Sequence, residues 1–441
     1  MSKAQTVGIA LVGCGTVGSH VARLLLGDAD MLTRRSGLKL QLRHVVDLDF
    51  TSAERAGVDR SICRSDLGIA LSDKQTQIVV ELVGGETFAK DVVCMSLEAG
   101  KSVVTANKAL LAKHGPELFA IARKSGACIG FGASCVGGVP VIGSILNGLL
   151  ANKIDALFGI VNGTCNFILT SMSQHGSDYA TVLAEAQEAG LAEADPTLDV
   201  SGADSAHKLT ILGSLAFGRR VDLASIYTEG IDDVDVADIR YGAELGYTAK
   251  LLAIAVSQGE AISLRVHPAF IRSDHPLSGV GGPFNAVCIY GHAVGHTMFY
   301  GRGAGGSATA SAVLADIIDV AIGNAQRRFD ELGIWPDVAP LADVLPIEQV
   351  RGRYYMRVTC EDSPGVLARI AEALGKRDIS IASMIQHEPA SAGSGVPLVF
   401  TTHEAVEGDV RAALGEIDAL DVVVQPTVTI RIIDEHEEAQ L

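Results

Sequence analysis

Asp204 and Lys208 are the two side chains whose spacing points most directly to chemistry. They stand four residues apart in the segment GADSAHKL, so a helix there would place a carboxylate and an ammonium on one face. Together these groups can bind a small zwitterion. The alternative is a surface ion pair, which is worth only about 0.3–0.5 kcal/mol. A second lysine, Lys108, follows the apolar run VVTAN and is expected at the carboxyl end of a buried strand, where open α/β folds bind ligands.

A glycine motif near the N-terminus predicts a binding site for a dinucleotide. Directly after an apolar run and before an amphipathic stretch, the chain has a Gly-x-Gly-x-x-Gly motif that comprises Gly13, Gly15, Thr16, Val17 and Gly18. The first glycine allows a tight turn, the second lets the backbone approach the pyrophosphate, and the third packs the helix on the strand. The amides of the first helical turn then bind phosphate. The sequence therefore predicts an NAD(P) cofactor.

Asp47 ends the next apolar run, QLRHVVD, and is the candidate for hydrogen bonding to the adenosine ribose. It lies beyond the usual offset of roughly 20 residues, so we expect an insertion around DADMLTRRSG. An acidic residue here favours NAD, whereas the 2′-phosphate of NADP needs a cation, for which Arg43, His44, Arg34 and Arg35 are the candidates. The alternative for Asp47 is a turn residue at a strand end. The choice between NAD and NADP stays open.

The elements that must position these residues begin with two large regions. In residues 1–138, short β-branched runs alternate with amphipathic stretches, which is typical of a parallel sheet with crossover helices. We expect a Rossmann-type nucleotide domain there. Residues 139–306 combine a long helical stretch, from about 179 to 217, with strand-like runs near 262–271 and 286–291. This mixture indicates an α+β domain.

The remaining chain predicts a helix, a linker and a third domain. Residues 307–332 have helical periodicity and are expected to pack back on the first domain. Three prolines then mark residues 333–352 as a linker. Residues 353–432 follow the order strand, helix, strand, strand, helix, strand, which is the order of a ferredoxin-like unit. The overall fold class is therefore α/β with a ferredoxin-like C-terminal domain.

The composition argues against several classes of protein. A net charge of -17 without a basic stripe disfavours binding to nucleic acid. The 8 cysteines form no Cys-x-x-Cys pair, so neither a zinc site nor a disulfide framework is indicated. No uncharged stretch reaches the roughly 18 residues of a membrane helix, and the N-terminal apolar run lacks the features of a signal peptide. We expect a soluble, cytoplasmic protein.

Five segments together resemble the homoserine dehydrogenases of the monofunctional bacterial type, which carry a C-terminal ACT domain. The segments are GCGTVG, VTANKALLAKHG, NGTCNFIL, EAGLAEADPTLDVSGADSAHKL and YGRGAGGSATASAVLADI. The resemblance implies an NAD(P)-dependent oxidoreductase acting on a CH–OH group, which reversibly reduces L-aspartate 4-semialdehyde to L-homoserine in threonine, methionine and isoleucine biosynthesis. It also implies that residues 139–306 carry catalysis and dimerisation.

Two other functions remain possible at this point: a catalytically silent amino-acid-binding regulator, and a dehydrogenase of a related amino-acid aldehyde or alcohol. A silent relative would have little reason to keep Lys108, Glu193, Asp204 and Lys208, all of which are present. The run EADPTLDVSGAD resembles the homoserine enzymes specifically. We therefore favour an active homoserine dehydrogenase.

The resemblance also implies roles for individual residues. Hydride arriving at an aldehyde carbon leaves charge on the oxygen, which needs a proton donor or a cation. Lys208 is implied as the proton shuttle, Lys108 as the group that orients the substrate and stabilises its charge, and Glu193 and Asp204 as ligands of the substrate amino group. The other implied substrate-site residues are Asp199, Gly163 and Thr164. The other implied cofactor-site residues are Gly84, Thr105, Lys108 and Gly303. A structural turn at residues 162–164 and close packing at Gly303 are the alternatives.

One segment departs from the family pattern. Many members have an acidic residue in a segment associated with a structural monovalent cation, and this chain has Gly132 at that position. Without a charged ligand, only neutral carbonyl oxygens remain for the cation. The backbone carbonyls of Cys135, Gly137 and Val139 are the candidates for Na⁺ or K⁺, and we expect such a site to be weak.

The C-terminal region resembles an ACT domain, a regulatory unit that binds small amino acids at subunit interfaces. The turn Asp362-Ser363-Pro364-Gly365 precedes a segment with apolar residues every four positions, which predicts a helix whose N-terminus can receive a carboxylate. The implied effector is L-threonine, acting as a feedback inhibitor, and the implied assembly is a homodimer or homotetramer. A purely dimerising ACT-like unit is the alternative.

Overall fold

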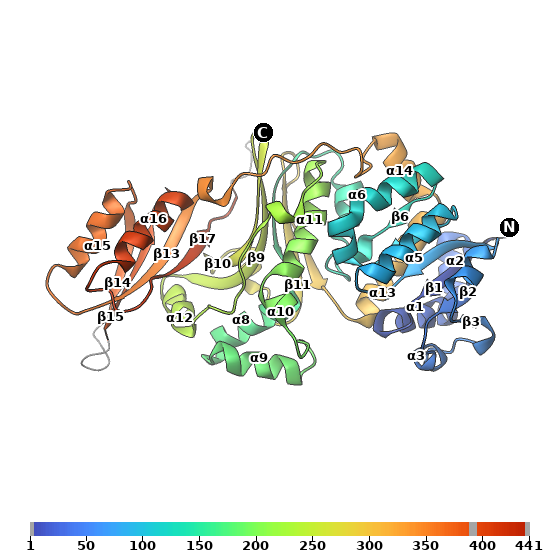
Figure 1. Ribbon diagram of the computed structural model, residues 1–441, viewed down its shortest axis with the longest axis horizontal. Coiled ribbons are helices and arrows are strands. Elements are labelled where there is room, and N and C mark those ends of the chain that lie inside the picture. Colours follow the sequence, from blue (N-terminus) through green and yellow to red (C-terminus); the bar gives the residue numbers. More distant parts are fainter. Residues whose placement is uncertain (1–3, 388–394, 437–441) are drawn as a thin grey trace.

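The computed structural model describes residues 4–387 and 395–436. Three parts follow one another along the long axis in Figure 1: the N-terminal part in blue, a central part in green and yellow, and the C-terminal part in orange and red. Within the described chain, no single helix is both long and apolar enough to cross a membrane. Only the pair α13 Gly306–Ala321 and α14 Asn324–Leu332 is long and apolar enough when taken together, and a 68° bend separates the two helices.

The N-terminal part is built on a parallel sheet with the strand order β3-β2-β1-β4-β5-β6, the order of a Rossmann fold. Its central strands are runs of Val, Ile and Leu buried on both faces, as expected of a sheet that helices cover on each side. The strands are β1 Gln5–Val12, β2 Leu38–Val46, β3 Cys63–Arg64, β4 Thr76–Glu81, β5 Ser102–Thr105 and β6 Ile129–Gly130.

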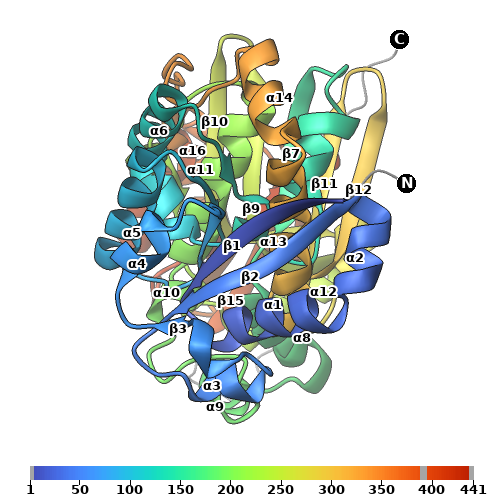
Figure 2. The same cartoon turned by 90° about the vertical axis from the view of Figure 1, so that its right-hand side faces the viewer.

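Short helices connect these strands and cover the sheet. In Figure 2 the strands β1 and β2 lie in front, with α1 and α13 close beside them. The helical elements of this part are α1 Thr16–Gly27, α2 Ala29–Ser36, α3 Thr51–Arg55, η1 Arg60–Ile62, α4 Leu67–Ser72, α5 Thr87–Glu98, α6 Lys108–Ser125 and η2 Gly132–Ser134. Helix α2 occupies the insertion that the distance between the glycine motif and Asp47 predicts.

The central part contains six strands of a second, 11-stranded sheet. Nine strands follow the order β12-β11-β7-β9-β10-β17-β13-β15-β14, and two short strands lie off this path, where β8 pairs with β10 and β16 pairs with β13. Its strands in this part are β7 Ile154–Ile160, β8 Tyr227–Thr228, β9 Tyr247–Gln258, β10 Ala261–Arg272, β11 Phe284–Gly291 and β12 Gly295–Arg302. Its helical elements are α7 Val141–Gly143, η3 Ser144–Gly148, α8 Gly163–His175, α9 Tyr179–Glu188, α10 Thr197–Val200, α11 Ala203–Phe217, η4 Leu223–Ser225, α12 Val236–Glu244 and η5 Pro276–Gly279.

The C-terminal part continues that same sheet. Its four long strands have the antiparallel order β17-β13-β15-β14, and β17 pairs in parallel with β10 of the central part. The elements are η6 Ile347–Gln349, β13 Arg351–Cys360, α15 Val366–Gly375, β14 Ile381–Gln386, β15 Val396–Thr402, β16 Ala405–Val406, α16 Glu407–Asp418 and β17 Val428–Ile433. The expected fold class, with a Rossmann-type sheet, an α+β part and a ferredoxin-like ACT unit, is confirmed.

Two stretches expected as single helices are interrupted. Residues 307–332 form α13 Gly306–Ala321 and α14 Asn324–Leu332, with a break at Gly323, whose φ of 77° is left-handed. The apolar face of α13 packs into the core of the first sheet, where Val313 and Ile317 join Ile9. The stretch from about 179 to 217 divides into α9, α10 and α11. The turns between these helices bring Asp199 to the site described next.

Candidate active site

One buried carboxylate holds two lysines that come from different parts of the chain. Asp204 lies in the first turn of α11, and its Oδ2 is 2.6 Å from the Nζ of Lys208, one turn further along the same helix. Its Oδ1 is 3.0 Å from the Nζ of Lys108, the first residue of α6. The predicted helix face therefore exists, and the pair is buried rather than on the surface, since the Asp204 side chain is only 4% exposed.

The charges of this cluster reinforce one another. Burial alone would raise the pKa of Asp204, but the ammoniums of Lys208 and Lys108 outweigh burial and hold that pKa below its usual value. Burial lowers the pKa of Lys108, and the Asp204 carboxylate outweighs it, so the net pKa of Lys108 is raised. Around neutral pH, Asp204 is therefore ionised and Lys108 is protonated. Such a cluster can bind a charged polar molecule and stabilise a developing oxyanion.

Asn162 fixes the orientation of both acidic residues. Its Nδ2 donates to Asp204 Oδ2 at 2.9 Å and to Asp199 Oδ1 at 2.7 Å. Its Oδ1 accepts the backbone N–H of Cys165 and so caps α8. The carbonyl of Val161, the preceding residue, accepts a 2.6 Å hydrogen bond from Lys208 Nζ. The end of β7 and the start of α8 thus hold Lys208, Asp204 and Asp199 in one arrangement.

The carboxyl ends of β4 and β5 position Lys108. Glu81, at the end of β4, is fully buried and accepts hydrogen bonds from Thr105 Oγ1 at 2.6 Å and from Val83 N at 2.9 Å. Thr105 Oγ1 in turn accepts the N–H of Asn107, whose side chain caps α6 through Leu110 N. Lys108 therefore starts its helix at a fixed point. Thr105 was predicted from the sequence, whereas Glu81 and Asn107 were not.

The glycine motif lies at the same edge of the first sheet. In the strand register, Val12 pairs with Glu81 and Glu81 pairs with Thr105, so the turn after β1 lies level with the start of α6. Gly13 has a φ of 89°. A Cβ on Gly18 would lie 2.1 Å from Gly13 O, whereas a Cβ on Gly15 would meet nothing within 4 Å. Gly13 thus makes the turn, Gly18 allows the helix to pack closely on the turn, and Gly15 leaves space for a phosphate to approach the backbone. These are the roles that the sequence predicts.

Gly84 and Gly303, two other predicted cofactor-site residues, lie outside the helices and strands. Gly84 follows β4, has a φ of 78° and donates its N–H to Glu81 Oε1 at 3.3 Å. Gly303 packs so closely on Asn285 that a Cβ would lie 1.2 Å from its Oδ1. Any side chain at position 303 would have to displace Asn285, which is hydrogen-bonded to Ile160 O.

Asp47 lies beside the glycine turn. Its Oδ2 accepts the N–H of Cys14 at 2.6 Å, and its Oδ1 accepts the N–H of Leu48 at 2.7 Å. Two of the cationic alternatives are already paired elsewhere, because Asp73 Oδ2 is 2.7 Å from Arg43 Nε and 2.9 Å from His44 Nε2. Arg34 and Arg35 are exposed in the last turn of α2.

The remaining predicted substrate residues surround the cluster without all contacting it. Gly163 begins α8, where a Cβ would lie 2.9 Å from Pro283 O. Thr164 Oγ1 donates to Leu191 O at 2.8 Å, so its hydroxyl anchors the turn before α10. Glu193 is exposed in that turn. Within residues 4–387 and 395–436, its carboxylate makes no contact with the lysines that Asp204 holds. Its backbone carbonyl accepts from Gln187 Nε2.

A buried lysine holds the loop that covers Gly163. Lys250, on β9, is 2% exposed, and its Nζ donates to Val280 O at 2.6 Å and to Asn166 Oδ1 at 3.1 Å. The Asn166 amide also donates to the carbonyls of Gly282 and Phe284. Burial lowers the pKa of Lys250 to about 8. Lys250 and Asn166 were not predicted from the sequence, because their partners are far away along the chain.

The segment with the candidate cation ligands contains no acidic side chain. Asp316 of α13 fills the space opposite Gly132, where a Cβ would lie 2.7 Å from its Oδ1, and accepts the N–H of Ala133 at 3.1 Å. Val139 O already accepts the N–H of Val141. In the part of the chain that the structure describes, no group of three His, Cys, Asp or Glu side chains could hold a metal. The surroundings of Cys135, Gly137 and Val139 thus offer a cation no carboxylate from their own segment, and the site remains a prediction.

Three family models match this chain in order. Residues 13–131 match the NAD-binding domain of homoserine dehydrogenase, residues 140–318 match homoserine dehydrogenase, and residues 354–421 match the ACT domain. These matches agree with the glycine turn, the Asp204 cluster and the C-terminal sheet. The nicotinamide-binding domain expected from the sequence is confirmed.

Full-length relatives and solved structures agree with these matches. A homoserine dehydrogenase of Pseudomonas aeruginosa is 41% identical over 97% of this chain and 99% of its own. One of Neisseria gonorrhoeae is also 41% identical, over 98% of this chain and 100% of its own. The crystal structure of a homoserine dehydrogenase from Thiobacillus denitrificans superposes with a TM-score of 0.90 at 40% identity, covering 98% of this chain and 99% of that one. This chain therefore belongs to the homoserine dehydrogenase family, a family of NAD(P)-dependent oxidoreductases.

Proposed function

We propose that the Asp204 cluster is the catalytic centre, where L-aspartate 4-semialdehyde is reversibly reduced to L-homoserine in the synthesis of threonine, methionine and isoleucine. The observation that carries this proposal is the sharing of one buried carboxylate by Lys108 and Lys208 at 3.0 and 2.6 Å, at the edge where the glycine turn lies. A bound nicotinamide supplies or accepts the hydride. The chain itself must then supply a proton and stabilise charge at the substrate oxygen.

Lys208 is the proposed proton shuttle. Its Nζ is held by Asp204 and by the carbonyl of Val161, which leaves one of the three ammonium hydrogens for a substrate oxygen. In the reducing direction this proton passes to the oxygen as the hydride reaches the carbon, and in the oxidising direction Lys208 recovers it. Lys108 adds a second positive charge beside the same carboxylate. Asp204 and Asp199, oriented by Asn162, are the proposed ligands of the substrate ammonium, with Glu193 as a further carboxylate from the adjoining turn.

The experiment that tests this proposal compares Lys208→Ala with Lys113→Ala. Lys113 lies on α6 and pairs with Glu86 near the surface, so it serves as a control that changes charge outside the cluster. We expect Lys208→Ala to lower kcat for homoserine oxidation by about 10²–10⁴-fold. The Kd for NAD(P)H, measured by fluorescence titration, should change little. A similar loss of cofactor affinity and of turnover would contradict the role of Lys208 as a proton shuttle.

We propose further that NAD is the preferred cofactor. Asp47 ends β2 beside the glycine turn, where a carboxylate can bind the two ribose hydroxyls and repels a 2′-phosphate. Arg43 and His44 are engaged by Asp73 and would have to leave it to bind that phosphate. A hyperthermophilic archaeal homoserine dehydrogenase, 28% identical over 72% of this chain, has been solved in complex with NADPH, so NADPH is the alternative that a comparison of the two cofactors must test.

For the ACT domain we propose feedback inhibition by L-threonine. Helix α15 begins at Val366, and its N-cap residue Gly365 has a φ of 92° and makes no side-chain hydrogen bond to the helix, so the first amides are not capped by a side chain. Free amides at a helix start suit an amino-acid carboxylate. Initial rates with L-threonine and with D-threonine test this proposal, and equal effects of the two enantiomers would contradict it.

We propose that the enzyme acts in the cytoplasm as a homodimer or homotetramer. The structure leaves all eight cysteines as free thiols, which is typical of a reducing compartment. Strand β14 forms one edge of the 11-stranded sheet, and Met384 on it is 42% exposed, so an edge is available for a second subunit. Light scattering of the full chain would measure the assembly, and a monomer at all concentrations would contradict the proposal.

A further inference from the structure

The segment 227–231 lies between the C-terminal part of the chain and the helix that carries Asp204. It comprises β8 and the three residues after it, and β8 pairs in parallel with β10, the strand that also pairs with β17. At the far end of the segment, Ile231 N donates to Val200 O at 2.8 Å. Val200 ends α10, and Asp204 lies in the first turn of α11. The segment thus reaches residues 200–202, which we call the α10–α11 turn.

The backbone of this segment packs closely on the α10–α11 turn. A Cβ on Gly230 would lie 2.4 Å from Val200 O and 2.8 Å from Ser201 Cα. A Cβ on Gly202, the N-cap residue of α11, would lie 3.1 Å from Glu229 O. A side chain at either glycine would therefore push the two backbones apart. The position of the segment thus determines where α10 ends and where α11 begins.

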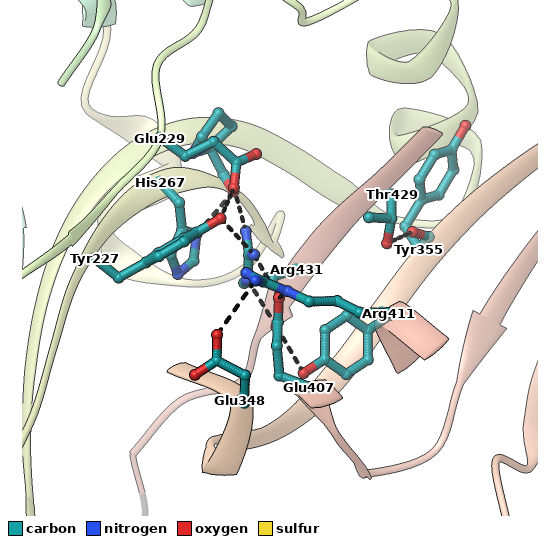
Figure 3. Close-up of polar contacts among 11 residues, drawn as sticks. Tyr227, Glu229, His267, Glu348, Tyr355, Glu407, Arg411, Thr429 and Arg431 are labelled. Carbon is teal, nitrogen blue, oxygen red and sulfur yellow. Dashed lines mark hydrogen bonds and ion pairs between the residues drawn. The ribbon is translucent and has the colours of Figure 1, made fainter. Parts of the chain in front are cut away.

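Arg431 of β17 holds the side chain of Glu229, as Figure 3 shows. Arg431 Nη1 donates to Glu229 Oε2 at 2.7 Å, and the Tyr227 hydroxyl donates to the same oxygen at 2.8 Å. The side chain of Arg431 is 9% exposed and that of Glu229 is 39% exposed, so solvent screens this ion pair only in part. Glu229 N donates to Val266 O on β10. Both the backbone and the side chain of Glu229 are thus anchored.

The ACT domain in turn holds Arg431. Glu407, the first residue of α16, accepts hydrogen bonds from Arg431 Nε at 3.0 Å and from Arg431 Nη2 at 2.6 Å. Arg411, one turn further along α16, donates to Glu407 at 2.9 Å and lies 3.5 Å from Glu348. Among the described residues, the Glu348 carboxylate forms an ion pair with Arg411 only. The guanidinium of Arg431 therefore connects α16 of the ACT domain to Glu229.

Two of the proposed substrate ligands flank the α10–α11 turn. Asp199 precedes the turn and Asp204 follows it, and Asn162 Nδ2 donates to both, at 2.7 and 2.9 Å. Hydrogen bonds weaken steeply when their geometry is distorted, so a shift of the turn would move one carboxylate away from the other and from Asn162. Lys208 would move less, because its Nζ is also held by Val161 O. A displaced turn should therefore weaken substrate binding more than the chemical step.

We propose that Glu229 is a positioning residue: through its ion pair with Arg431, the ACT domain holds the α10–α11 turn in the geometry that binds the substrate ammonium. This inference rests on the proposed function of the Asp204 cluster. Glu229 acts through the turn rather than on the substrate. A ligand that displaces β17 would change the affinity for substrate by this route, because β17 carries Arg431.

The test compares Glu229→Gln with Glu348→Gln in the full chain. Each variant removes one carboxylate from the same group of charges, but only Glu229 adjoins the α10–α11 turn. We expect Glu229→Gln to raise KM for homoserine by about threefold to tenfold, while kcat stays within about twofold of the wild type. Glu348→Gln should change neither parameter, and the Kd for NAD(P)H should be the same in both variants. An unchanged KM in Glu229→Gln, or an equal increase in Glu348→Gln, would overturn the proposal.

Thermal melting separates positioning from a general loss of stability. Glu229→Gln should melt at nearly the same temperature as the wild type, because the side chain is partly exposed and a glutamine oxygen can still accept a hydrogen bond from Arg431. A large drop in its Tm together with the rise in KM would assign Glu229 a structural role and would contradict the proposal.

Gly230→Ala tests the second contact of this route without changing any charge. The added Cβ must displace Val200 O, so KM for homoserine should rise at least as much as in Glu229→Gln. A folded Gly230→Ala variant with the KM of the wild type would also overturn the proposal. If Gly230→Ala does not fold, the comparison of Glu229→Gln with Glu348→Gln decides alone.

Lys208→Ala distinguishes failure of this inference from failure of the proposed function. If Lys208→Ala retains its turnover, the Asp204 cluster is not the catalytic centre and both proposals fail. If Lys208→Ala loses turnover while Glu229→Gln keeps the KM of the wild type, only the role of Glu229 is wrong.

Discussion

The neighbours of Asp204 determine its ionisation. Burial opposes its ionisation, and two lysines and an asparagine amide reverse that effect. The carboxylate fixes both Lys108 and Lys208, whose ammonium groups would otherwise repel each other. Removing its charge should therefore affect the positions of both lysines at once.

Asp204→Asn is the first prediction at this scale. The neutral amide cannot balance the ammonium groups of Lys108 and Lys208, so we expect kcat/KM for homoserine to fall by about 10²-fold or more, with an increase in KM as well as a loss of kcat. Asp195→Asn, in an exposed position of the neighbouring turn, should leave both parameters almost unchanged. Steady-state rates at saturating cofactor provide the measurement. Equal rates for the two variants would remove Asp204 from the site.

Asp47→Ser is the second prediction, and it concerns the choice of cofactor. The serine removes the charge that repels a 2′-phosphate while keeping an oxygen near Cys14 N. We expect the ratio of kcat/KM for NAD to that for NADP to fall by about tenfold. Asp49→Ser, two residues further on and exposed, is the matched control. An unchanged ratio in Asp47→Ser would show that this carboxylate does not contact the adenosine ribose.

The sequence predicted those site residues whose signal is local. The spacing of Asp204 and Lys208 placed them on one helix face, and the strand-end position of Lys108 placed it at the ligand-binding edge of the sheet. Asn162 as the bridge between two acids, and Glu81 as the anchor of two strand ends, were not predictable from spacing. Their partners lie 24 to 42 residues away along the chain, so only the folded structure brings them together.

At the scale of elements, α13 and the segment 132–134 form a contact with an unusual buried acid. Asp316 accepts the amides of Ala133 and Gly132, and burial raises its pKa from 3.8 to about 7. A raised pKa means that the fold favours the neutral acid. The stabilisation is complete below about pH 4 and is lost as the pH rises through 7.

Asp316→Asn should reverse that pH dependence. The amide stays neutral at every pH, so relative to the wild type its free energy of unfolding should improve by about 2–4 kcal/mol between pH 4 and pH 8. Asp319→Asn, on the same helix but partly exposed and paired with Arg328, should show no such trend. Denaturant unfolding at several pH values checks the prediction. A difference between Asp316→Asn and wild type that stays constant with pH would show that Asp316 is already ionised in the fold.

The sequence predicted those helices and strands that have a regular pattern of apolar residues and distinct residues at their ends. The buried runs that became β1, β2, β4 and β5 were recognised from their β-branched residues. The strands β7, β9 and β12 were missed, although β9 and β10 form a 12-residue antiparallel pair. Strands β7 and β9 are buried along most of their length, which removes the alternation that identifies a half-buried strand. The break at Gly323 was missed because a single glycine inside a periodic stretch is compatible with a continuous helix.

At the scale of the whole molecule, the ACT domain is joined to the central part more tightly than a linker implies. The sequence predicted a linker at 333–352 followed by a separate unit. In the structure, β17 continues the central sheet by pairing with β10, from Ala269–Arg431 to Ile271–Ile433. Deleting the chain after residue 349 would therefore expose an edge of β10, so a stable truncated enzyme is not expected. Point substitutions at the junction are better probes of communication between the domains.

Arg357→Met tests that view of the junction. Arg357 of β13 binds Asp238 of α12 with two hydrogen bonds, at 2.6 and 2.8 Å, and the Asp238 side chain is fully buried. In the Arg357→Met variant, Asp238 would keep its hydrogen bond from the Tyr355 hydroxyl at 2.7 Å. Because the variant leaves a buried carboxylate without its cation, we expect a loss of about 3–5 kcal/mol in the free energy of unfolding.

The controls for Arg357→Met separate the buried ion pair from a general effect of losing an arginine. Arg369→Met breaks an exposed pair with Asp421 inside the ACT domain and should cost less than about 1 kcal/mol. The double variant Asp238→Asn, Arg357→Met removes the uncompensated charge and should recover part of the loss. If Arg357→Met is no less stable than Arg369→Met, the two domains do not depend on each other for stability. If instead its loss is large and one cooperative transition remains, the central and ACT parts unfold as a single unit, as their shared sheet requires.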